Sequence, residues 1–244
     1  MDIPLYFYIA YDDLDRLSPG SEETTGRVID MIDFNIDDEI NILDIGCGVG
    51  QATIQLANHF RNSEIEAVDL FRHYLDVLDE KIREDNLQKR VFTYKMDMRD
   101  LDFANEDFDM VFAEASIEII GFKKGLQEWK RLLKPKGYLI VSDVSWIGNP
   151  SAESRKFWKN TYDEIDTIEN KISQIRNEGY VFIGNVTVPK EDWKCYHEQL
   201  EENLNKLNGD ASARDFVRQL KKEINAYRQN SDDYSYVFYI MRRC

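Results

Sequence analysis

NILDIGCGVGQ, residues 41–51, is the stretch that decides the fold of this chain. It opens with a short apolar run, residues 42–45, of the kind that forms a buried parallel strand. Three glycines then alternate with Cys47 and Val49, which is typical of a turn that tolerates positive φ and lets a ligand approach the backbone. Residues 51–60 predict a helix. A strand, a glycine turn and a helix N-terminus together favour a site for a nucleoside-containing ligand, although a tight turn without a ligand has the same pattern.

Predicted strands and helices alternate on both sides of this stretch, which indicates an α/β fold with a doubly wound parallel sheet. Up to residue 142 the pattern predicts five strands, at residues 42–45, 64–70, 91–96, 108–113 and 138–142. The helices predicted between them cover residues 51–60, 71–84 and 123–133, and KPKG is expected to end the last of these helices before the fifth strand. An N-terminal helix is expected at residues 22–32, with Ser21 as its cap. Beyond Asp143 the pattern predicts helices at 168–178, 190–207 and 211–228 and strands at 180–188 and 234–243.

Composition limits the classes of partner. The 244 residues carry a formal net charge of −15 and 43% hydrophobic residues, so we expect a substantial core and no nucleic acid or anionic membrane as a main partner. No apolar run approaches the roughly 20 residues of a membrane span, and the acidic start lacks the basic region of a signal peptide, which favours a cytoplasmic location. The three cysteines form no CxxC pair, so no metal site is expected.

Two acids have positions that suit a nucleoside ligand. Asp69 ends the second predicted strand, where an acid can accept hydrogen bonds from both ribose hydroxyls. That geometry alone does not separate NAD from S-adenosylmethionine. The pattern GxGxxG would place a glycine at position 51, where this chain has Gln51, and Asp97 after the third strand can accept from an adenine amino group. Taken singly, Asp97 also fits a solvated turn acid.

The motifs DIGCGVG, MDMRDLDF, FDMVFAEASIEIIGF and WKRLLKPKGYLIVSD resemble, in this order, those of class I S-adenosylmethionine-dependent methyltransferases. RLSPGS near the start and the closing YSYVFYI extend the resemblance to a type 11-like subgroup of uncharacterised prokaryotic small-molecule methyltransferases. The resemblance implies a Rossmann-like seven-stranded sheet whose last strand is antiparallel. Lys136 departs from the glycine that is usual before the fifth strand.

The resemblance also implies the residues of the site. Asp44 would order the loop or contact the amino group of the cofactor, Asp69 would hold the ribose, and Glu114 is the candidate catalytic acid at the end of the fourth strand. A general base is optional, because direct transfer depends mainly on positioning. The implied partners are S-adenosyl-L-methionine and a small-molecule acceptor, with no metal, and a homodimer stays open. The expected cofactor-binding residues are Asp44, Gly46, Cys47, Gly48, Gly50, Asp69, Leu70, Asp97, Met98, Glu114 and Ala115.

We expect one methyltransferase domain over residues 1–244. It divides into an N-terminal helix or lid (1–39), a core sheet (40–189), a helical insertion (190–230) and a final strand (231–244). The aromatic residues Tyr6, Phe7, Tyr8 and Tyr11 fit no single helical or strand period, and either pack outside the sheet or cover the site. Two other functions remain open at this point: an NAD(P)-dependent oxidoreductase, and a non-catalytic protein that binds S-adenosylmethionine.

Overall fold

The five predicted strands of the first half form the parallel part of one mixed sheet. The structure is a computed structural model and describes residues 3–244, within which the sheet has eight strands. Their order is β3-β2-β1-β4-β5-β8-β7, with the short β6 pairing with β5. The parallel strands are β1 (Asn41–Ile45), β2 (Glu64–Asp69), β3 (Val91–Lys95), β4 (Phe108–Ala113) and β5 (Leu133–Trp146).

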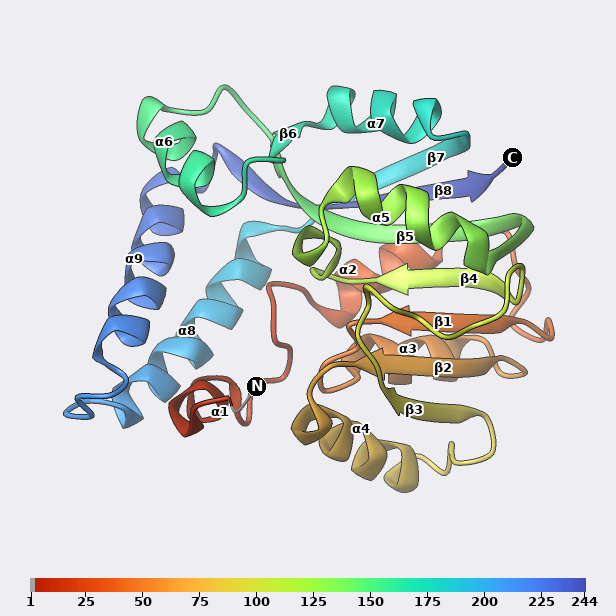
Figure 1. Cartoon of the computed structure of the whole chain (residues 1–244), viewed down its shortest axis with the longest axis horizontal. Helices are drawn as coiled ribbons and strands as arrows, with labels where there is room; N and C mark the ends of the chain where they lie inside the picture. The colour runs from red at the N-terminus through yellow and green to blue at the C-terminus, as the bar shows by residue number, and fades with distance from the viewer. Residues whose placement is uncertain (1–2) are drawn as a thin grey trace.

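The antiparallel last strand is confirmed. β8 (Tyr234–Arg243) pairs antiparallel with β5, from Tyr138 opposite Arg242 to Trp146 opposite Tyr234. β7 (Tyr180–Thr187) forms the edge beyond β8, and the two-residue β6 (Asp166–Thr167) was not predicted. Because β5 and β8 continue past the end of β4, they project beyond the edge of the sheet as a two-stranded ribbon (Figure 1).

The predicted boundary between the helix of residues 123–133 and a fifth strand beginning after KPKG was wrong, because α5 ends at Trp129. β5 begins at Leu133 and runs through these residues, while the pairing with β4 shifts register between Phe108 and Met110. The extra residues are absorbed as an irregularity of the strand, with Lys136 at φ +67°. That left-handed conformation explains why a glycine would be easier to accommodate at this position.

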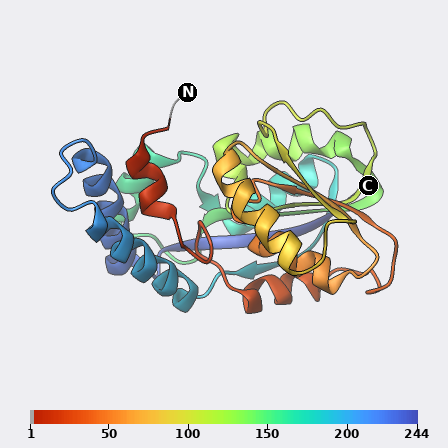
Figure 2. The same cartoon turned by 90° about the horizontal axis from the view of Figure 1, so that it is seen from below.

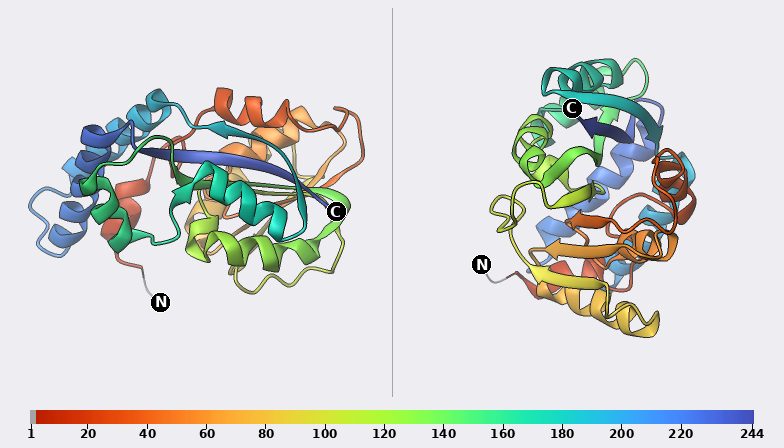
Figure 3. Two further views of the ribbon diagram at one scale, coloured as in Figure 1. Left: turned by 90° about the horizontal axis from the view of Figure 1, so that it is seen from above. Right: turned by 90° about the vertical axis from the view of Figure 1, so that its right-hand side faces the viewer.

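Helices cover both faces of the sheet. One face carries α2 (Glu22–Ile29), α3 (Gln51–His59) and α4 (Arg72–Glu84), whose Val28, Leu56 and Leu78 pack into a single core cluster with the strands. The opposite face carries α5 (Phe122–Trp129) and α7 (Ile168–Asn177), and two short 3-10 turns, η1 (Ile117–Ile119) and η2 (Lys130–Leu132), flank α5. The predicted doubly wound arrangement is therefore confirmed (Figure 3).

Four further helices form a lobe at one end of the sheet. They are α1 (Leu5–Tyr11), α6 (Ala152–Thr161), α8 (Lys190–Lys206) and α9 (Arg214–Asn230). The arrowheads of β1, β2 and β4 point toward this lobe in Figure 1, and Figure 2 shows α1 between α8 and α4. The carboxyl ends of the parallel strands thus face the helical lobe. Among the described residues, no helix is long and apolar enough to cross a membrane.

The N-terminal segment is fixed to the lobe. Its aromatic residues lie on the helix α1 and contact different neighbours, with Tyr6 on Phe216 of α9 and Tyr8 on Tyr74 of α4, so no single face of the helix carries all four. Ala10 packs with Leu200 and Leu204 of α8. The predicted Ser21 cap is confirmed, because its side chain accepts a hydrogen bond from the Thr24 backbone N–H. The hydroxyls of both residues also donate to the buried Asp192 of α8.

Trp193 of α8 ties the predicted insertion to the sheet. Its ring stacks on Tyr227 of α9 with centroids 4.1 Å apart, and its Nε1 donates to Ser235 Oγ of β8 at 2.8 Å. Only 3% of Trp193 is exposed. The side chain is therefore part of the core and not of an exposed subunit surface.

Candidate functional site

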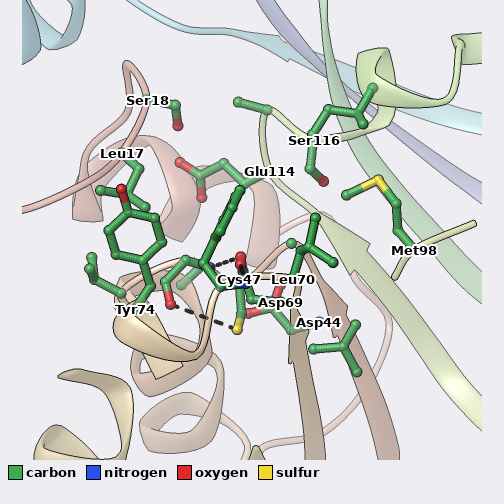
Figure 4. Close-up of a pocket in the computed structure, with 18 of the residues that line it drawn as sticks. Leu17, Ser18, Asp44, Cys47, Asp69, Leu70, Tyr74, Met98, Glu114 and Ser116 are labelled. Carbon is green, nitrogen blue, oxygen red and sulfur yellow. Dashed lines mark hydrogen bonds between the residues drawn. The ribbon is translucent and has the colours of Figure 1, made fainter. Parts of the chain in front are cut away.

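A cavity of about 350 Å³ opens at the carboxyl ends of β1, β2 and β4, between the sheet and the N-terminal segment (Figure 4). Parallel α/β sheets bind ligands at this edge. Ten of the eleven expected binding residues line the cavity. These ten are Asp44, Gly46, Cys47, Gly48, Asp69, Leu70, Asp97, Met98, Glu114 and Ala115.

The glycine turn forms the floor of the cavity. Its three glycines have φ of +75°, +54° and +78°, and the backbone N–H groups of Gly46 and Cys47 both donate to the Val68 carbonyl of β2. A Cβ at Gly46 would lie 2.7 Å from Ser116 Cβ, so a side chain here would collide with the loop after β4. Gly50 does not line the cavity: it caps α3 and a Cβ there would collide with Leu78.

Asp69 is held at the end of β2 by two backbone donors. Gly48 N–H donates to Asp69 Oδ2 at 3.0 Å, and Phe71 N–H donates to Oδ1 at 2.8 Å. Each carboxylate oxygen keeps a lone pair for a further donor. Burial raises the pKa of Asp69, and these backbone hydrogen bonds oppose that rise. The carboxylate is thus oriented before any ligand binds.

Asp44 is buried beneath the turn. Thr53 Oγ1 of α3 donates to Asp44 Oδ2 at 2.5 Å, which joins the end of β1 to the helix that follows the turn. Burial raises the pKa of Asp44 to about 7, the Thr53 hydrogen bond opposes this, and the charges of Glu114 and Asp69 add to it. Asp44 therefore orders the loop and also contributes a titratable group to the cavity.

Four further residues line the cavity, namely Leu70, Asp97, Met98 and Arg99. Leu70 is 46% exposed, although it is a large apolar residue, and it lines the cavity. Arg99 forms an ion pair with Asp97 at 2.6 Å and lowers the pKa of Asp97 to about 2. These residues offer the cavity an apolar surface and an ionised carboxylate.

Glu114 follows β4 and is paired with Arg16 of the N-terminal segment. Arg16 Nη1 donates to both carboxylate oxygens at 2.9 Å, and the two side chains are 9% and 10% exposed. Burial raises the pKa of Glu114, and Arg16 opposes this. Gly20 also packs on this acid, since a Cβ there would lie 2.4 Å from Glu114 Oε1. The motif RLSPGS thus closes one side of the cavity.

The loop after Glu114 is held in an unusual conformation. Ala115 has φ +47°, and its N–H donates to Ser142 Oγ of β5 at 2.7 Å. Ser116 Oγ donates to the Ile45 carbonyl of β1 at 2.8 Å. A left-handed non-glycine residue is uncommon and concentrates at functional sites, so the loop is shaped by its neighbours and not by local preference.

Several lining residues were missed as site residues by the sequence analysis. Arg16 belongs to a motif noted only for its resemblance, whereas Phe7 and Tyr11 belong to the aromatic group for which a lid was considered. Quoted motifs also contain Leu17, Ser18, Gln51, Ser116 and Ile119, to which no role was assigned. Nothing in the local pattern marked Phe71 and Tyr74, because helix and loop positions acquire a shared face only on folding. The missed residues include Phe7, Tyr11, Arg16, Leu17, Ser18, Gln51, Phe71, Tyr74, Ser116 and Ile119.

Comparison with known proteins agrees with this geometry. Residues 42–137, which contain the glycine turn, Asp69, Asp97 and Glu114, match the family described as methyltransferase domain. Over residues 42–137, this chain is a methyltransferase domain. S-adenosylmethionine is the methyl donor of this family. Among residues 3–244, no group of three or more His, Cys, Asp or Glu side chains could hold a metal ion.

Relatives of this methyltransferase differ in how far they match. An uncharacterised Haemophilus influenzae protein is 27% identical over 191 residues, 68% of this chain and 75% of its own length. The methyltransferase GfsG of Streptomyces halstedii is 27% identical over 132 residues, 54% of this chain and 46% of its own length. A methyltransferase structure from Thiobacillus denitrificans, in complex with S-adenosyl-L-homocysteine, matches with a TM-score of 0.85 and 17% identity, over all of both chains. That identity supports the fold and not the choice of acceptor.

Proposed function

We propose that this protein transfers a methyl group from S-adenosyl-L-methionine to a small-molecule acceptor. The observation that carries the proposal is Asp69, held by the Gly48 and Phe71 N–H groups with free lone pairs beside the glycine turn. A carboxylate fixed in this way suits two neighbouring ribose hydroxyls. Family membership supports the same reading.

The polar groups of the cavity fit this cofactor. S-adenosylmethionine presents an ammonium, a sulfonium, a ribose diol and an adenine amino group, which are cations or hydrogen-bond donors. The cavity presents the carboxylates of Asp44, Asp69, Asp97 and Glu114. The same carboxylates would repel the pyrophosphate of a nicotinamide cofactor. The donor set therefore supports S-adenosylmethionine over NAD(P).

We assign the binding roles along the cavity. Gly46 and Gly48 allow the methionine part to approach the backbone, and Asp44 faces its amino group. Asp69 accepts from the ribose, while Leu70, Asp97 and Met98 surround the adenine. The bound cofactor supplies a methyl group that its sulfonium has already activated, so the remaining task of the protein is to place the acceptor in line.

On the acceptor side, Glu114 and Arg16 form a rigid wall. Because Arg16 donates to both oxygens of Glu114, this acid is less suited to accept a proton than a free carboxylate would be. Its proposed role is to fix the N-terminal segment against the methyl-transfer site. Ile119, which is 64% exposed and lines the cavity, offers an apolar surface to the acceptor.

The domain division expected from the sequence remains part of the proposal. In it, residues 40–189 bind the cofactor, and residues 1–39 with 190–230 shape the acceptor side. The strongly acidic composition supports a small molecule, and not nucleic acid, as the acceptor. A cytoplasmic location and a homodimer remain expectations.

Two measurements test the proposal. In titration calorimetry, S-adenosylhomocysteine should bind and NADH should not. Incubation of a metabolite extract with methyl-labelled S-adenosylmethionine should then transfer label to a small molecule. Binding of S-adenosylhomocysteine with no labelled product from varied extracts would favour a non-catalytic binding protein, and binding of NADH alone would contradict the assignment.

A further inference from the structure

The cavity at the glycine turn has to accommodate one anionic group of its cofactor. S-adenosylmethionine carries a carboxylate beside its amino group, but four acids already line the cavity, namely Asp44, Asp69, Asp97 and Glu114. The lining cations of the described chain are Arg16 and Arg99, and each is paired with one of these acids. A buried carboxylate is stable only when it accepts hydrogen bonds, so it needs donors that these pairs leave free.

Tyr74 of α4 has such a donor. It lines the cavity and is 4% exposed, and its hydroxyl is buried and has no hydrogen-bond partner within residues 3–244. A buried hydroxyl without a partner costs free energy, which a ligand that brings an acceptor recovers. Burial raises the pKa of Tyr74, so the group remains a hydrogen-bond donor at neutral pH.

The position of Tyr74 beside the glycine turn is fixed by packing. Its ring contacts the rings of Phe71 and of Tyr8 in α1, with centroid distances of 5.8 Å and 6.1 Å. Leu78, four residues later on α4, packs against Gly50, where a Cβ would collide with it. Residues four apart share one face of a helix, so Tyr74 lies on the face of α4 that packs on the turn.

The loop of residues 16–18 supplies further donors. Figure 4 shows Leu17, Ser18 and Tyr74 together on one side of the cavity, with the Tyr74 hydroxyl directed toward Leu17. Ser18 is half-buried, lines the cavity, and forms no side-chain hydrogen bond within the described chain. The Nη nitrogens of Arg16 have partners, whereas its Nε has none among the described residues.

Leu17 covers the backbone next to these donors. Its Cδ1 lies 3.0 Å from the position of a Cβ on Gly48, and it lines the same cavity. The methionine part of the cofactor is expected to approach the backbone at this glycine. The side chain of Leu17 is therefore the group that such a ligand displaces.

We propose that the carboxylate of the methionine part binds at this corner, where it accepts hydrogen bonds from Tyr74, Ser18 and Arg16 Nε. The Leu17 side chain turns away from Gly48 to admit it, which gives the carboxylate access to the Tyr74 hydroxyl. This inference rests on the proposed methyltransferase function. The ammonium group of the methionine part then faces an acid while its carboxylate faces donors, so both charges are compensated.

The test compares two ligands that differ only in this group, S-adenosylhomocysteine and its decarboxylated analogue, in which hydrogen replaces the carboxylate. Titration calorimetry measures the affinity of the full-length protein for both. We expect the wild type to bind S-adenosylhomocysteine about tenfold or more tightly than the analogue. Tyr74→Phe should weaken binding of S-adenosylhomocysteine roughly fivefold or more and leave binding of the analogue unchanged. Ser18→Ala should reduce the same preference.

Stability separates a binding role from a structural one. Because Tyr74→Phe removes an unpaired buried hydroxyl, the ligand-free variant should melt at the same temperature as the wild type or higher, although it binds S-adenosylhomocysteine less tightly. Tyr227→Phe is the matched control, because Tyr227 also has a buried hydroxyl without a partner in the described chain but does not line this cavity. It should leave both affinities unchanged.

Equal binding of the two ligands by the wild type would overturn this inference. So would equal weakening of both ligands in Tyr74→Phe, no weakening of either, or the same loss in Tyr227→Phe. If Tyr74→Phe does not fold, Ser18→Ala decides by the same comparison. If S-adenosylhomocysteine does not bind to the wild type, the proposed methyltransferase function fails instead.

Discussion

Arg16 and Glu114, 98 positions apart in the sequence, form a nearly buried ion pair in which one guanidinium nitrogen donates to both carboxylate oxygens at 2.9 Å. The pair fastens the N-terminal segment to the end of β4. It therefore joins two walls of the cavity through a single interaction.

Replacement of Arg16 by Ala should destabilise the protein by about 3 to 5 kcal/mol, because it leaves Glu114 buried without its partner. Urea unfolding measures this loss. The double variant R16M/E114L should recover most of it, since a buried ion pair can be replaced by apolar groups at little cost. Arg27→Ala, at an exposed position of α2, is the control. A loss in R16A no larger than in R27A would show that the pair does not hold the segment.

Asp69→Ala should weaken binding of S-adenosylmethionine by roughly 1.5 to 3 kcal/mol, or about tenfold or more, the range for hydrogen bonds to a charged group. Titration calorimetry on the wild type and the variant gives the difference. Asp102→Ala removes an exposed acid and should have no effect. An unchanged dissociation constant in a folded D69A protein would remove Asp69 from the site.

Asp44 should make stability depend on pH in a defined direction. Its folded-state pKa, about 7, lies above the ordinary value of 3.8, so the folded protein binds the proton more tightly. The stabilisation is complete below about pH 4 and is lost as the pH rises toward about 7. For the ligand-free proteins, the free energy of unfolding of the wild type minus that of Asp44→Asn should therefore fall by on the order of 4 kcal/mol over that pH interval.

Using the difference between the two proteins removes the contribution of other groups, such as the buried His197, whose pKa is lowered by burial to about 4. Asp30→Asn, a substitution at the exposed C-cap of α2, should give a difference that does not change with pH. If the difference in free energy of unfolding between the wild type and D44N is equally independent of pH, or rises with pH, a raised pKa of Asp44 is contradicted.

The N-terminal helix should respond to the cofactor. Phe7 lines the cavity and packs on Phe71 at 5.7 Å between ring centroids, whereas the neighbouring Tyr6 packs on Phe216 of the lobe. We expect S-adenosylhomocysteine to protect residues 3–21 from hydrogen exchange; residues 1–2 of the predicted lid lie outside the described residues. Phe7→Ala should lower turnover more than Tyr6→Ala at similar melting temperatures.

Deletion of residues 1–15 would also remove Ala10 and Leu14 from the lobe core, so the point variants separate closure of the site from packing. Equal protection with and without ligand, together with equal turnover of F7A and Y6A, would reduce the segment to packing.

The sequence by itself determined the order of strands and helices and the placement of the expected binding residues after the strands. Asp69 and the glycine turn were recognisable because the carboxyl end of a parallel strand and the turn beside it are local features, read from apolar runs and glycines. The edge of the sheet at which the cofactor is expected could be predicted for the same reason. The start of β5 was not, because Lys134 to Gly137 have turn-like letters and lie in the irregularity between the pairs Phe108–Leu133 and Met110–Tyr138.

Only the tertiary structure decided the acceptor side. Arg16 pairs with Glu114, and Tyr236 with Glu118, across 98 and 118 positions, and no local pattern specifies such distances in sequence. These side chains meet because the lobe helices share one apolar cluster with the ribbon of β5 and β8, while α1, α8 and α9 pack together in a second cluster. Hydrophobic burial is non-directional, so the sequence pattern predicts which faces are covered but not which polar groups the covering brings together.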